Sequence, residues 1–90
     1  MYKLTVQNVN NVKNPGELVI VKNYEGNSLA RVKPSANADC TAWLKANGQT
    51  PRHIPNWTAS QRNTLLTRKV RASDNTTGKT NSFEFVLLKI

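Results

Sequence analysis

The sequence lacks most of the features that identify a function at first sight. It has one cysteine, Cys40, which excludes an internal disulfide framework, and one histidine, His53. A single Cys and a single His fall short of the ligand set of a zinc site, so we expect no metal and no cofactor. No apolar run approaches the length of about 18 residues that a membrane-spanning helix needs. What remains is a domain held together by side-chain packing.

Acidic side chains are also scarce. The chain has 5 Asp and Glu against 13 Lys and Arg, a formal charge of +8 in 90 residues. The apolar fraction of 38% suffices for one modest core, so residues 1–90 are expected to form a single domain. The first residues, Met1 to Val6, lack the apolar segment of a secretory signal, which predicts a cytoplasmic protein.

The N-terminal half carries signals for strands and a helix. Apolar and polar residues alternate from residue 2, which predicts a strand that ends or bulges near Val9. Residues 17–23 are apolar on both faces, as in a central strand, and residues 28–33 are expected to return as its hairpin partner. Pro34 ends that second strand. Residues 36–47 then predict a helix, with Cys40, Trp43, Leu44 and Asn47 on its buried face and Gly48 after its end.

The C-terminal half is less regular. Two prolines and a glycine in 48–57 predict an irregular connection. The run 58–72 fits either a helix or a short helix over 59–66 followed by a strand, and we favour the second. That strand is expected to pair antiparallel with 82–90, across a polar loop at 74–81.

These elements predict an α+β fold. We expect a two-layer sandwich in which a sheet of four to five strands, mainly antiparallel, is covered by one or two short helices inserted between strands 3 and 4. The alternative is a small β-barrel.

The positive charge is concentrated in one stretch. Between Asp39 and Asp74 there is no acidic residue, and the cations there are Lys45, Arg52, Arg62, Arg68, Lys69 and Arg71. Most of them are arginines, whose planar guanidinium matches two phosphate oxygens and stacks on bases. On a strand, Lys69 and Arg71 share one face and Arg68 takes the other.

We therefore predict a phosphate-binding patch made by Arg62, Arg68, Lys69 and Arg71, with Arg52 and Lys45 at its rim. Trp57 lies next to this basic segment and would stack on an unpaired base if it is exposed. The candidate nucleic-acid-binding residues are Arg52, Trp57, Arg62, Arg68, Lys69 and Arg71.

Three functions fit this distribution of charge. The leading one is a non-enzymatic protein that binds DNA or RNA through backbone phosphates. The alternative is a small phage or mobile-element factor that docks on an acidic surface of a host protein or nucleoprotein. A second alternative is a small basic ribonuclease-type toxin that uses His53 for proton transfer beside Arg52. No segment pairs a basic face with a large apolar one, so we expect no membrane binding, and a homodimer stays open.

Overall fold

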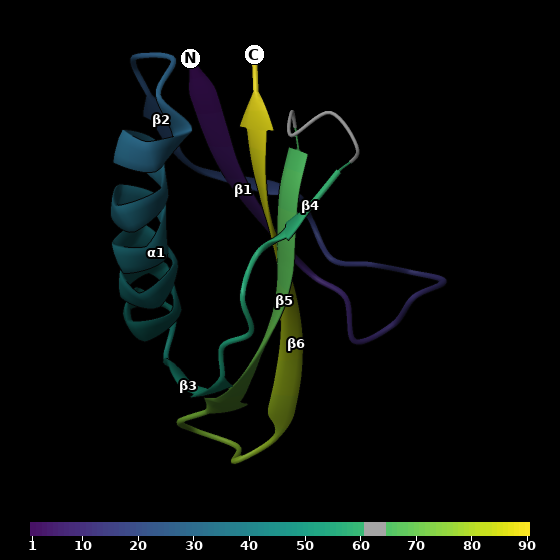
Figure 1. Ribbon diagram of the computed structural model, residues 1–90. Coiled ribbons are helices and arrows are strands. Elements are labelled where there is room, and N and C mark those ends of the chain that lie inside the picture. The colour runs from purple at the N-terminus through teal and green to yellow at the C-terminus, as the bar shows by residue number, and fades with distance from the viewer. Residues whose placement is uncertain (61–64) are drawn as a thin grey trace.

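The computed structural model describes residues 1–60 and 65–90. The described residues form six strands and one helix, and their order along the chain can be followed in Figure 1. The elements are β1 (Tyr2–Asn8), β2 (Val19–Tyr24), α1 (Leu29–Ala46), β3 (Gln49–His53), β4 (Thr58–Ala59), β5 (Leu65–Asp74) and β6 (Thr80–Lys89). The prediction of an α+β fold is therefore confirmed.

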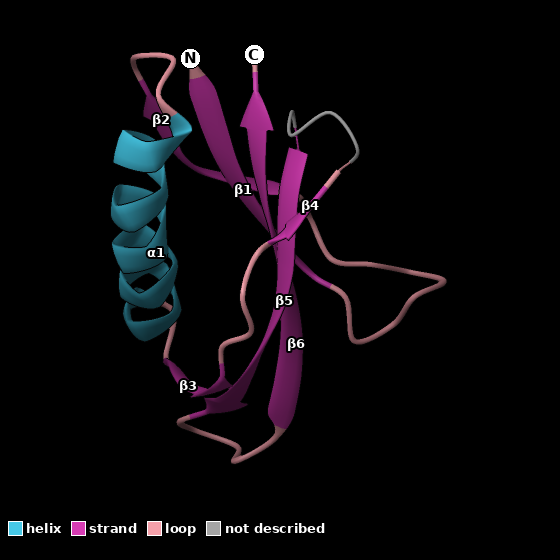
Figure 2. Cartoon of the chain, in the orientation of Figure 1, coloured by secondary structure: helices cyan, strands magenta, loops and turns pink. Residues whose placement is uncertain are grey.

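The strands form one open antiparallel sheet in the order β2-β1-β6-β5-β3, and the short β4 also pairs with β5. Because β2 and β3 lie at opposite edges and do not pair, the barrel alternative is wrong. Figure 2 shows α1 on one side of the sheet, while the loop between β1 and β2 projects on the other side. We call the side away from α1 the open face.

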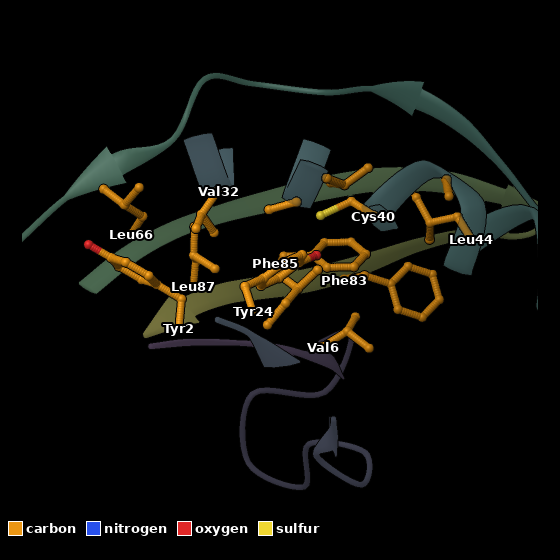
Figure 3. Close-up of a cluster of buried hydrophobic side chains, with 14 residues drawn as sticks. Tyr2, Val6, Tyr24, Val32, Cys40, Leu44, Leu66, Phe83, Phe85 and Leu87 are labelled. Atoms are coloured by element: carbon orange, nitrogen blue, oxygen red, sulfur yellow. The ribbon is translucent and has the colours of Figure 1, made fainter. Parts of the chain in front are cut away.

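The core lies between α1 and the sheet. Strand alternation sends every second side chain of β1, β5 and β6 toward the helix, where Leu4, Val70 and Phe85 are fully buried. From the helix, Val32, Ala36, Cys40 and Leu44 enter this layer at a spacing of four residues, as Figure 3 shows for Val32 above Leu87. Trp43 closes one side of the core by packing edge-on against Phe83 and Phe85, with ring centres 5.6 and 6.1 Å away.

The strand predicted over 28–33 is wrong, because Ser28 is the N-cap of α1 and the residues after it form the first turns of that helix. Val32 lies four residues and Leu29 seven residues before Ala36, which is the spacing of one helix face. These two residues therefore extend the buried stripe of the predicted helix toward its N-terminus. Pro34 lies inside the helix on an exposed surface. Its missing N–H costs one intrahelical hydrogen bond, but the buried stripe runs through that position without interruption.

The predicted central strand is also placed differently. It exists as β2, but it is an edge strand paired only with β1 among the described strands. Its apolar residues divide between the two faces: Val19 and Val21 pack against the core, whereas Ile20 is 58% exposed on the open face. A register shift between Leu4 and Thr5 on the partner strand marks a bulge there, which is typical of an edge strand.

The segment after the helix is more regular than predicted. Residues 49–53 form β3, in which Pro51 is tolerated because β3 is the outermost strand and one of its edges needs no hydrogen bonds. The helix predicted over 59–66 is contradicted at both ends, since Ala59 lies in β4 and Leu65 and Leu66 lie in β5. Residues 61–64, its middle, lie outside the described residues.

Two other predictions are confirmed. β5 pairs antiparallel with β6 across the polar turn that follows Asp74. Gly48 follows α1 with a positive φ of 71°, the left-handed conformation expected after a helix end. The helix is a single one between β2 and β3 in the described chain, rather than an insertion after a third strand. It is not apolar enough to cross a membrane, and the described residues offer no other helix that is.

Candidate nucleic-acid interface on the open sheet face

The basic run on β5 is divided by the alternation of the strand. Lys69 and Arg71 are exposed on the open face, whereas Arg68 is buried between the sheet and α1. Leu66, Val70 and Ala72 share the buried side with Arg68. The structure therefore brings Lys69 and Arg71 together, about 7 Å apart along the strand, and separates both from Arg68.

Arg52 joins the two open-face cations from the neighbouring edge strand. Its Nε donates a hydrogen bond of 2.8 Å to Oγ of Ser73, which lies two residues beyond Arg71 on the same face. The register shifts between Pro51 and His53, so Arg52 has no cross-strand partner, and its hydrogen bond to Ser73 is what places it beside Arg71. We call Arg52, Lys69 and Arg71 the β5 basic cluster.

The cations of the β5 basic cluster are available to a ligand. Among the described residues the one ion pair joins Lys22 to Asp39, at 3.7 Å on the opposite side of the sheet. Glu84 is the cross-strand neighbour of Lys69, yet the two make no ion pair. Because Arg52 uses Nε for Ser73, its terminal nitrogens stay free to face solvent or an anion.

Arg68 and Trp57 form a separate arrangement under the helix. Arg68 is 7% exposed, and its guanidinium lies 4.6 Å from the centre of the Trp57 ring. Trp57 Nε1 donates a hydrogen bond of 2.6 Å to Oδ1 of Asn37 on α1, and its ring packs against the core. Within the described chain, Arg68 Nε has no hydrogen-bond partner. Both side chains thus point away from the β5 basic cluster.

Arg68 also influences the thiol of Cys40. Burial raises the pKa of Cys40, and the hydrogen bond and positive charge of Arg68 partly oppose that rise. A buried thiol of this kind is unreactive, which agrees with its place in the core.

The remaining predicted residues do not add to the cluster. Arg62 lies outside the described residues. Lys45, predicted at the rim, is exposed in the last turn of α1 on the other side of the sheet. His53 is exposed beside Arg71, and none of the hydrogen bonds of the described residues involves its ring. Nor do His, Cys, Asp and Glu gather anywhere in residues 1–60 and 65–90 as a metal site would require.

One exposed basic residue on the cluster's side of the sheet is absent from the sequence-based prediction. Lys13 lies in the loop between β1 and β2, which projects on the same side of the sheet as the cluster (Figure 1). Its position is visible only in three dimensions, because the loop is distant from β5 in sequence and outside the acid-free stretch.

Comparison with family models, with curated proteins and with solved structures finds no match to this chain.

Proposed function

We propose that this protein is a non-enzymatic nucleic-acid-binding protein that holds backbone phosphates on its open sheet face. The observation that supports this best is the β5 basic cluster: Arg52, Lys69 and Arg71 come from two adjacent strands, are all exposed, and make no ion pair with a described carboxylate. Two guanidinium groups and one ammonium group match the oxygens of successive phosphates. A nucleic-acid partner also accords with action in the cytoplasm.

An acidic protein partner is the second candidate, because of apolar side chains on the same face. Ile20 is 58% exposed and Leu88 is 39% exposed, and both lie on the open face, Ile20 on the opposite edge strand and Leu88 at the end of β6 away from the cluster. A protein partner would bury these side chains while pairing its carboxylates with the cluster. Phosphate contacts alone would leave them in water.

The proposal is tested by titrating a mixed-sequence oligonucleotide, followed by fluorescence anisotropy at several salt concentrations. Three phosphate contacts predict that log K falls against log salt with a slope of about −2.7 on a duplex. In the variant Lys69→Ala/Arg71→Ala the slope is expected to become shallower by about 2, since each lost contact removes about 0.9.

The matched control is Arg31→Ala/Lys33→Ala, which removes the same two residue types from exposed positions of α1. Its slope and affinity should stay close to those of the unmodified protein. Equal losses in both double variants would mean that net charge, not the cluster, determines binding. Absence of saturable binding at low salt would reject a nucleic-acid ligand and favour the acidic protein.

A further inference from the structure

The loop between β1 and β2 projects on the same side of the sheet as the β5 basic cluster (Figures 1 and 2). Val9, at its start, donates its backbone N–H to the carbonyl of Ser82 at 2.9 Å, and Ser82 is the cross-strand partner of Arg71. The loop therefore leaves the sheet two strands away from Arg71, about 10 Å. It projects on the side opposite α1 (Figures 1 and 2), which is the side that carries Arg71. We call residues 9–18 the β1–β2 ribbon.

The base of the ribbon is held closed by hydrogen bonds. Gly16 donates its N–H to the carbonyl of Asn8, and the side chain of Gln7 donates to the carbonyl of Gly16, both at 2.8 Å. A Cβ at position 16 would lie 3.2 Å from Cβ of Asn8, so glycine permits this close approach. Asn10 fixes the same end to β6, since its Oδ1 accepts a hydrogen bond from the N–H of Ser82. The outgoing and returning chains are thus joined at the base, and beyond it residues 10–14 form bends rather than strands.

The tip of the ribbon presents side chains of three chemical types. Oδ1 of Asn11 accepts hydrogen bonds from the N–H groups of Lys13 and Asn14, which shapes the turn at the tip. The side chains of Val12, Lys13 and Asn14 are all exposed, and Val12 is the most exposed of the large apolar residues described, at 86%. No neighbouring element of the described chain covers them.

These side chains suit the edges of base pairs in the major groove. A Lys ammonium binds the acceptors of guanine, an Asn amide binds adenine, and an apolar side chain contacts the methyl group of thymine. The major groove is about 12 Å wide, and an exposed loop of two neighbouring chain segments would fit into it. Arg71 lies about 10 Å from the base of the β1–β2 ribbon, on the side where the backbone bordering the groove would run.

The distribution of aromatic residues argues against a single-stranded ligand. Binding of single strands depends on exposed aromatic rings that stack on unpaired bases. All six aromatic residues lie on the α1 side or in the core: Tyr2, Tyr24, Trp43, Trp57, Phe83 and Phe85. Trp57, the one predicted to stack, is held by Asn37 and Arg68. The open face therefore contacts phosphates and groove edges without stacking.

From these observations we infer that the ligand is a nucleic-acid duplex, and that the β1–β2 ribbon enters its major groove while the β5 basic cluster holds the adjacent backbone. This inference rests on the proposed function, because it names the form of the nucleic acid and adds a second contact. It assigns base contacts to Val12, Lys13 and Asn14, which would give the protein a sequence preference.

The test compares a mixed-sequence DNA duplex with one of its single strands, using the full chain. Tighter binding of the duplex is expected, together with protection of guanine N7 in the major groove from methylation by dimethyl sulfate. The variant Lys13→Ala should lose that protection and weaken duplex binding about tenfold, a typical cost of one base contact. Lys33→Ala removes an equally exposed lysine from α1 and should change affinity less than twofold.

The outcomes separate the two proposals. If the duplex binds with the expected salt dependence but guanine N7 stays reactive, or if the single strand binds as tightly, the groove contact is wrong and phosphate binding stands. If neither oligonucleotide binds, both proposals fail and the acidic protein partner replaces them. Lys13 is an exposed loop residue, so the unfolding midpoint of its variant should match the unmodified protein and confirm that the fold is unchanged.

Discussion

Arg68 lies with its guanidinium 4.6 Å from the centre of the Trp57 ring, beneath the segment that joins β3 to β4. No carboxylate of the described chain pairs with this buried cation, so the indole ring provides its electrostatic compensation. The same ring reaches α1 through the hydrogen bond from Trp57 Nε1 to Asn37. Trp57 thus joins the β3–β4 connection to both layers of the fold, which gives it a structural role independent of any ligand.

Replacing Trp57 with alanine is expected to destabilise the protein by about 2–4 kcal/mol. The change removes a partly buried ring, the cation–π contact and one hydrogen bond, and it exposes Arg68. Trp57→Phe keeps an aromatic ring but loses the N–H and the second ring of the indole, so its cost should be smaller, about 1–2 kcal/mol. Urea unfolding followed by circular dichroism measures both. A Trp57→Ala protein as stable as the original would contradict the anchoring role.

Replacing Arg68 with methionine is expected to leave stability unchanged or to raise it by up to about 3 kcal/mol. A buried cation with an unpartnered Nε carries a desolvation cost that an apolar side chain of similar length avoids. Arg68→Ala leaves a cavity instead and should destabilise. Neither variant should alter the salt slope of nucleic-acid binding. A loss of slope in Arg68→Met would return Arg68 to the phosphate contacts first predicted for it.

Tyr24 is expected to make stability fall at alkaline pH. Burial, and then the hydrogen bond to Asp39 with its negative charge, raise the pKa of the Tyr24 phenol above its usual value. Because the pKa is raised by folding, this contribution is complete below the unfolded pKa of about 10 and is lost as pH rises above it. Tyr24→Phe should cost about 1–2 kcal/mol at neutral pH, by loss of the hydrogen bond to a carboxylate.

The difference in the free energy of unfolding between the original protein and Tyr24→Phe should shrink as pH rises from about 10 to 12. Only the original protein carries a phenol at position 24 that ionises on unfolding. Lysine titration affects both proteins alike and cancels in the comparison. Urea unfolding across this pH range measures the difference. A constant difference would show that Tyr24 ionises as easily in the folded protein as in the unfolded one.

The sharing of one face by Lys69 and Arg71 is predictable from sequence, because side chains alternate along any strand. The long pairing of β5 with β6 is predictable for the same kind of local reason: both runs are rich in apolar and β-branched residues and flank a polar turn. The burial of Arg68 cannot be predicted from the sequence, because it depends on Trp57 and on the helix, which are close to β5 only in the folded chain. The distribution of charge along the sequence therefore predicts a larger phosphate-binding patch than the folded chain presents, because it includes the buried Arg68.

The length of α1 shows a second limit of prediction from the sequence. The spacing of Leu29, Val32 and Ala36 follows a helical stripe, but the proline at position 34 favours a break before it when only the sequence is considered. A proline on the exposed side of a helix loses one hydrogen bond and leaves the buried stripe intact, so packing decides. The direction of the β1–β2 ribbon has no local signal at all, because it follows from which face α1 covers.

Cys40 offers a probe of how tightly the two layers are held together. It is 1% exposed between α1 and the sheet, and burial raises the pKa of its thiol, so the folded protein should barely react with a thiol reagent such as DTNB at neutral pH. If only opened molecules react, the rate should be at least about a thousandfold lower than in urea, given a stability of about 5 kcal/mol or more. Trp57→Ala should speed the reaction about tenfold for each 1.4 kcal/mol of stability that it loses, because it loosens the contact over Arg68 beside the thiol. A fast reaction in the unmodified protein, unchanged by urea, would mean that the helix does not seal this part of the core.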